Sequence, residues 1–217
     1  MKDGWQAPLA ALVVVILFAA FDAKPMQSAA DIAAWVQGVG SLFAIIAAVW
    51  IYTKQYRDKK ADDENETRAF VQAIRHEVET VWAEYCEAAR PALHAIKTGQ
   101  YYDSMVPIAA YDLVTYNNSS ARVGKIDDEA LRASIVTVYT RLRSHLNSIQ
   151  LNNSLVETLE QVSLTYHLND REQQMGRRFN SMNSYAEALK KSDATLGNNI
   201  DTFLVSIDVW LASHPAR

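Results

Sequence analysis

Two stretches near the N-terminus are almost continuously apolar. Residues 9–21 contain no polar side chain, and residues 32–52 have only Gln37 and Ser41 as polar positions. A helix rises about 1.5 Å per residue, so about 20 apolar residues cross the hydrocarbon core of a bilayer. The pattern therefore predicts two membrane-spanning helices, at about residues 5–21 and 32–52, joined by a short loop.

The first span also has features of a secretory signal peptide, because Lys2 precedes its apolar core. Cleavage after Ala20 or Ala23 would place Phe18 or Phe21 at the −3 position, where signal peptidases prefer a small residue. We therefore expect the first span to be retained in the protein.

The basic residues of the chain predict its orientation in the membrane. The second span is followed by Lys54, Arg57, Lys59 and Lys60, whereas the loop between the spans has only Lys24. The positive-inside rule then places both the N-terminus and the large C-terminal part in the cytoplasm. The single cysteine, Cys86, is compatible with that reducing compartment and excludes an intramolecular disulfide.

One face of the second span carries small and weakly polar residues. At 100° per residue, an arc of roughly 100° contains Gln37, Gly40, Ser41, Ala44 and Ala48. Small residues four apart let two helices approach closely. Two interpretations remain open: this stripe packs against the first span, or it forms a self-association face around a narrow pore lined by Gln37 and Ser41.

The second span is predicted to continue into the cytoplasm as one helix, because no Gly or Pro occurs between Ser41 and Arg90. Beyond the span, apolar residues recur with heptad spacing, which indicates a helix that packs into a bundle. These residues are Val71, Ile74, Val78, Val81, Tyr85, Ala88, Ala92 and Ala95.

Four further apolar stripes predict helices in the rest of the chain. The first follows Asp127, a good helix N-cap, and is expected to be broken at Asn152 and Asn153. The others cover residues 155–166, 175–189 and 196–211, and a polar stretch precedes the one at 175–189. The helix after Asn153 and the one at 175–189 are expected to be either one bent helix or two.

The segment 99–126 is expected to hold a short helix near 107–116 and a loop at 117–120. No run of residues alternates strictly between apolar and polar, so no sheet is predicted. The predicted fold is an all-α membrane protein, with a transmembrane hairpin at 1–53 and a cytoplasmic helical domain at 54–217.

Composition and motifs point away from catalysis. The net charge of −4 gives no sign of a nucleic-acid coat, and the chain contains no phosphate-binding glycine loop, HExxH or GxSxG motif. None of the five histidines has a metal-binding partner at helical spacing. We expect no enzymatic activity, no metal and no cofactor.

Two clusters of charge are candidate functional sites. The first is acidic and follows the second span directly: Asp62, Asp63, Glu64 and Glu66. It is either a solvated helix surface or, in an oligomer, an acidic ring that concentrates cations at a pore mouth. The second cluster is basic and could hold the phosphates of a ligand or serve only solubility: Arg122, Lys125, Arg171, Arg177 and Arg178.

Two segments carry a family resemblance: WVQGVGSLFAIIAAVWIYTKQ in the second span, and AAYDLVTYNNSSARVGKIDDEALRASIVTVYTRLRSHLNSIQL after it. Over about residues 30–150 the chain resembles small two-span bacterial membrane proteins with a cytoplasmic helical domain. Such proteins are encoded as membrane effectors in antiphage defence, the Hailong-type effector among them. The resemblance implies a protein of the bacterial inner membrane that responds to a nucleotide or oligonucleotide signal, or to the protein that makes it.

These observations predict a homo-oligomeric channel or pore in the lipid bilayer, gated from the cytoplasm and serving defence by membrane disruption. A tetramer is one assembly that would provide such a pore. The alternatives are a non-conducting anchor that binds a protein partner, and a phage-encoded holin or exclusion factor. The large cytoplasmic part disfavours a holin, which consists mostly of membrane spans.

Overall fold

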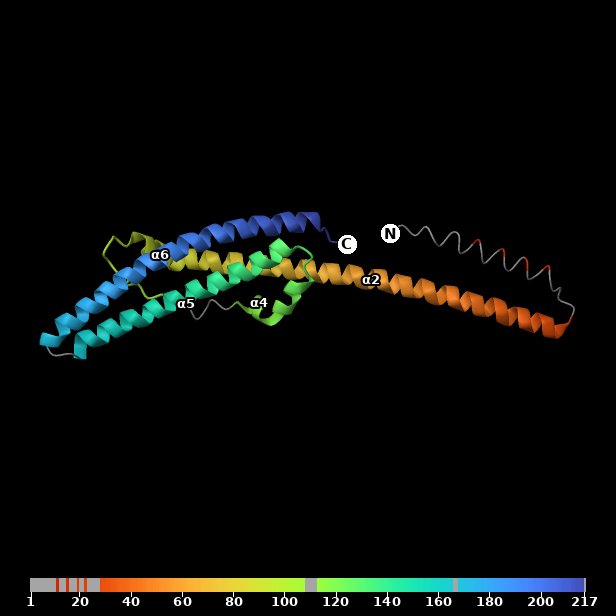
Figure 1. Ribbon diagram of the computed structural model, residues 1–217, viewed down its shortest axis with the longest axis horizontal. Helices are drawn as coiled ribbons and strands as arrows, with labels where there is room; N and C mark the ends of the chain where they lie inside the picture. Colours follow the sequence, from red (N-terminus) through yellow and green to blue (C-terminus); the bar gives the residue numbers. More distant parts are fainter. Residues whose placement is uncertain are drawn as a thin grey trace. The chain divides into compact units, whose positions relative to one another are not determined.

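The computed structural model describes residues 28–107, 113–165 and 168–216 and the single positions 11, 15, 19 and 22, with side chains described outside 163–171. Across these residues the secondary structure is helical, without a strand (Figure 1). The elements are α2 (Ala29–Ala88), α3 (Arg90–Ala95), α4 (Val114–Ser119), the 3-10 helix η2 (Ser120–Lys125), α5 (Glu129–Thr165) and α6 (Leu168–Ser213).

The predicted all-α class is therefore confirmed for the described chain. The first predicted span lies outside the described residues apart from three isolated positions, so the transmembrane hairpin stays a prediction. The chain divides into two compact units, Met1–Lys60 and Ala61–Arg217.

Helix α2 has 60 residues and continues without a break through residues 54–66, as the sequence predicted. It begins with a reciprocal cap: the Ser28 amide donates to the Asp31 carboxylate at 3.0 Å, and the Asp31 amide donates to the Ser28 hydroxyl at 3.2 Å. It ends before a turn at Ala89, where Pro91 cannot supply the amide hydrogen that a continuing helix needs.

The core of the second unit lies between three helical segments. Figure 1 shows α5 and α6 side by side and antiparallel, and the C-terminal part of α2 contributes to the same buried cluster. The predicted heptad stripe is buried up to Tyr85. From Tyr85 the buried stripe continues in steps of four residues, through Ala89 and Leu93, in place of the predicted Ala88 and Ala95, while Ala92 is partly buried against the same core.

Two predicted interruptions are wrong. Helix α5 passes through Asn152 and Asn153 without a break, because a loop supplies partners for both amides. The Asn152 amide donates to the Tyr102 carbonyl at 2.9 Å, and the Asn153 side chain both donates to the Val106 carbonyl at 2.7 Å and accepts from its amide at 3.2 Å. The expected loop at 117–120 is helical, divided between the end of α4 and the start of η2.

The C-terminal region is simpler than its hydrophobic pattern indicated. The stripes at 175–189 and 196–211 belong to one continuous helix, α6, of 46 residues. The short helix expected near 107–116 is represented by α4, which begins at Val114, and residues 108–112 are not among the described ones.

Candidate functional site

The N-terminal half of α2 is apolar and exposed. It contains an 18-residue window with a mean hydropathy of 2.0, of which 0% is buried. Val36, Phe43 and Trp50 each expose more than 60% of their surface. By length and composition this part of α2 can cross a membrane, and a patch of this kind would be unfavourable in water.

The predicted small-residue stripe lies on this part of α2. Gln37, Gly40, Ser41, Ala44 and Ala48 are all exposed. The Ser41 hydroxyl donates to the Gln37 carbonyl at 2.7 Å, so its hydrogen-bonding capacity as a donor is satisfied inside the helix. No described atom would lie within 4 Å of a Cβ added at Gly40. The stripe is therefore an exposed face of small side chains that another helix could approach closely.

The acidic cluster of α2 and part of the basic cluster meet each other. Lys125 Nζ lies 3.3 Å from Asp63 Oδ1, and Arg122 Nη2 lies 4.0 Å from Glu66 Oε2. All four side chains are about half exposed, so these pairs contribute little stability. They do offset the negative charge of the cluster, whose other members, Asp62 and Glu64, lie on the same helix.

The five basic ligand candidates are not gathered in one place. Arg122 and Lys125 lie in η2, just before the start of α5. Arg177 and Arg178 lie on α6 beside the other end of α5, where Phe179 packs against the cluster of Val156 and Leu159. The side chain of Arg171 is outside the described set. The pair Arg122 and Lys125 and the pair Arg177 and Arg178 therefore do not form one phosphate site together.

A buried ionic network links α2, α3 and α6. Asp193 of α6 has a fully buried side chain. Its carboxylate accepts from Arg90 Nε at 3.2 Å and from the Tyr85 hydroxyl at 3.0 Å, and it lies 2.7 Å from His94 Nε2. A buried carboxylate is tolerated only with such partners, and this network fixes the register of α6 against α2.

Burial perturbs the groups around this network. Desolvation raises the pKa of the Cys86 thiol, which the nearby Arg90 lowers only in part, so the thiol is not an activated nucleophile. Desolvation and the negative charge of Asp193 raise the pKa of Tyr85. Desolvation lowers the pKa of His145 to about 4, and this residue is therefore neutral at pH 7. These shifts follow from core packing and do not create a poised acid–base pair.

Glu77 of α2 binds the start of α4. Its carboxylate accepts the Thr115 amide at 2.6 Å and the Tyr116 amide at 3.3 Å, so it compensates the unpaired amides of the first turn of α4. The Tyr139 hydroxyl of α5 donates to the same carboxylate at 2.6 Å. Desolvation first, and the bond to Glu77 second, raise the pKa of Tyr139. Glu77 thus joins three elements.

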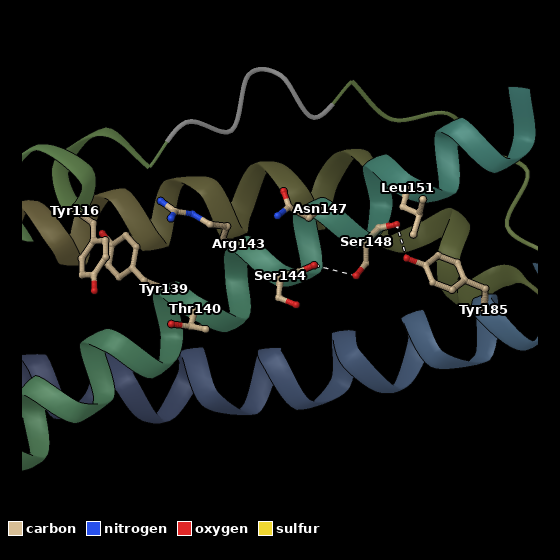
Figure 2. A pocket seen from close by; sticks show the side chains of 9 residues that line it. All are labelled: Tyr116, Tyr139, Thr140, Arg143, Ser144, Asn147, Ser148, Leu151 and Tyr185. Carbon is tan, nitrogen blue, oxygen red and sulfur yellow. Dashed lines mark hydrogen bonds between the residues drawn. The ribbon is translucent and has the colours of Figure 1, made fainter.

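A groove of about 440 Å³ lies next to this junction (Figure 2). At one end Tyr116 and Tyr139 stack, with ring centroids 4.2 Å apart. The polar side chains of α5 continue from there, Arg143 and Asn147 among them, and Tyr185 of α6 lies at the other end. The volume is within the usual range for small-molecule sites.

Sequence reasoning missed this groove because its residues come from three separate helices. No family model, curated protein or solved structure matches the chain. The one signal in the sequence was the polar i, i+4 pair of Arg143 and Asn147 on an otherwise amphipathic helix, which is also the ordinary pattern of a solvated face.

Proposed function

We propose that the protein is a homo-oligomeric membrane channel, gated by a signal that acts on its cytoplasmic helical domain. The observation that carries the proposal is the apolar part of α2, in which no residue of the 18-residue window is buried and which belongs to the same helix as the core residues Val71 to Tyr85. A helix that is both a membrane span and a core element can transmit a change in the domain to the membrane.

In this proposal α2 crosses the bacterial inner membrane with its basic end, residues 54–60, in the cytoplasm. The small-residue stripe then faces the oligomer axis, where Gln37 and Ser41 line the pore and Gly40 lies where neighbouring helices touch. The acidic cluster lies at the cytoplasmic mouth. Because Asp63 and Glu66 are paired with η2 cations, its attraction for cations is weaker than four unpaired carboxylates would provide.

The physiological role that fits is antiphage defence. The resemblance to two-span bacterial membrane effectors supports this role, in which a nucleotide or oligonucleotide signal, or the protein that makes it, triggers a breach of the membrane. No motif in the chain identifies the signal, and the proposal of conduction does not depend on it.

Single-channel recording in planar bilayers tests the proposal. Ser41→Leu and Ala44→Leu should lower the conductance, because a crowded axis has no room for a larger side chain. Gly40→Leu should weaken association, since the added side chain separates the helix backbones. Gly38→Leu is the matched control: it lies two residues away, about 160° around the helix, and Leu is well tolerated by lipid there.

A purified particle that is monomeric and carries no current would contradict the proposal. The exposed part of α2 would then be a non-conducting anchor for a domain that binds a protein partner. Equal conductance in the parent, the stripe variants and the Gly38 control would show that the stripe does not line a conducting path.

A further inference from the structure

The groove beside α5 has an uneven distribution of charge. Among the described residues that line it there is one cation, Arg143, and no carboxylate. Arg143 donates to the Asn117 side chain, which holds the guanidinium in place while several of its five donors remain available. Ser144 and Asn147 add a hydroxyl and an amide along the same helix. The polar part of the groove is therefore suited to an anion.

The ends of the groove are aromatic. The stacked pair of Tyr116 and Tyr139 borders the Arg143 side, and Tyr185 borders the other, with its hydroxyl donating to the Ser148 carbonyl at 3.0 Å. That bond fixes the ring of Tyr185 across the interface between α5 and α6. Tyr139 is buried and supports Tyr116, whereas Tyr116 and Tyr185 are partly exposed. Fixed, partly exposed rings offer flat apolar surface at a small cost in conformational entropy.

We propose that this groove binds a small organic anion that carries a ring. Its anionic group contacts Arg143 and the neighbouring amide and hydroxyl donors, and its ring lies against Tyr116 or Tyr185. The proposed binding deepens the proposed function, and its regulatory part rests on that function. Two residues that border the groove also donate hydrogen bonds to Glu77 of α2: Tyr116 through its backbone amide and Tyr139 through its hydroxyl. A ligand in the groove therefore acts on the helix that carries the apolar span.

Isothermal titration calorimetry of the full chain in detergent micelles tests binding without any need for current. The probes are phenyl phosphate and benzoate, with inorganic phosphate as the anion without a ring and benzyl alcohol as the ring without a charge. We expect saturable binding of at least one ring-bearing anion, tighter than either part alone. Arg143→Gln should weaken it by about tenfold or more, the value of a lost charge-assisted contact.

Two further variants separate a binding role from a structural one. Arg143→Lys keeps the charge and should retain part of the affinity. Arg141→Gln is the matched control, because it removes an exposed arginine two residues away that does not line the groove, and it should leave the affinity unchanged. Far-ultraviolet circular dichroism of each variant verifies the fold.

The inference is overturned if neither phenyl phosphate nor benzoate binds saturably, if benzyl alcohol binds as tightly, or if the Arg141 variant loses as much affinity as the Arg143 variant. Current without binding would remove this inference and leave the channel in place. Binding without current would do the reverse, so the two failures are distinguishable.

The link to α2 has its own measurement. Binding of the ring-bearing anion should slow amide hydrogen exchange in α4 and around Glu77 in the parent, and Tyr139→Phe should abolish the effect around Glu77 while the ring that borders the groove is kept. An unchanged exchange response in Tyr139→Phe would show that the ligand does not act through this bond.

Discussion

Acid should destabilise the second unit through His145. This residue of α5 is 1% exposed; its Nδ1 lies 3.0 Å from the Ser192 hydroxyl, and its Nε2 has no hydrogen-bond partner among the described residues. Burial lowers its pKa from 6.5 to about 4, although the negative charge of Asp193 opposes the shift. Below pH 6.5 the His145 side chain therefore binds a proton in the unfolded chain, whereas in the folded chain it becomes protonated only near pH 4.

The size of the effect follows from linkage. The histidine contributes no pH dependence above pH 6.5, and its effect on the free energy of unfolding grows as the pH falls from 6.5 to about 4. The full shift corresponds to about 3 kcal/mol, at about 1.36 kcal/mol per pKa unit. At pH 5 the loss should already be about 2 kcal/mol, a large part of the usual 5–15 kcal/mol of a domain.

Urea unfolding of the full chain in detergent, followed by tryptophan fluorescence and circular dichroism between pH 7.5 and pH 4.5, measures this loss. Leucine has a similar volume to histidine and no titrating group. Between pH 7.5 and pH 5, the His145→Leu variant should therefore lose about 2 kcal/mol less of its free energy of unfolding than the parent. His76→Leu is the control for the same substitution at an exposed histidine, because the His76 side chain is 73% exposed. If the slope of His145→Leu equals that of the parent, burial of His145 is not the cause.

Three other variants test the contacts that order the domain. Asp193→Ala should lower the free energy of unfolding by about 1–3 kcal/mol, because it leaves the buried Tyr85 hydroxyl without its acceptor; no measurable loss, read from urea midpoints, would count against the network. Glu77→Gln should cost about 1–3 kcal/mol and speed hydrogen exchange of the first α4 amides, and unchanged exchange would argue against its capping role. Asn153→Ala should remove exchange protection from the Val106 amide while α5 stays helical; continued protection would mean that another group holds it.

The sequence predicted those features that depend on neighbours along the chain. The run without Gly or Pro correctly predicted one long helix, α2. The heptad spacing from Val71 to Tyr85 correctly predicted which face is buried. Both are local patterns with a period, and a helix expresses such patterns directly.

Prediction failed where a side chain finds its partner far along the chain. Asn152 and Asn153 look like helix breakers because an unpartnered amide competes with the helix backbone. The loop carbonyls at Tyr102 and Val106 remove that competition, since they bind the amides from about 50 residues away. No local rule contains that information, so the helix boundary was placed wrongly.

The groove beside α5 was not predicted from the sequence, for the same reason. The basic cluster was one hypothesis for a ligand site, and two of its members, Arg122 and Lys125, lie against the acidic cluster. The groove instead depends on Tyr116, Arg143 and Tyr185, which have no shared spacing.

The anchoring of α2 indicates which part of the domain is able to respond to a ligand. Arg68 donates to the Leu211 and His214 carbonyls at the end of α6, and Arg75 donates to Asp208 one level further along α2. With the bond from Tyr85 to Asp193, these bonds join α2 to α6 at three levels. By contrast, α4 is a short helix that α2 holds through Glu77. A signal that reaches α2 through this weaker attachment has to alter only a few hydrogen bonds, whereas one that separated α2 from α6 would have to break a buried ionic network. The groove lies beside the weaker attachment, and that is the physical reason to test ligands there first.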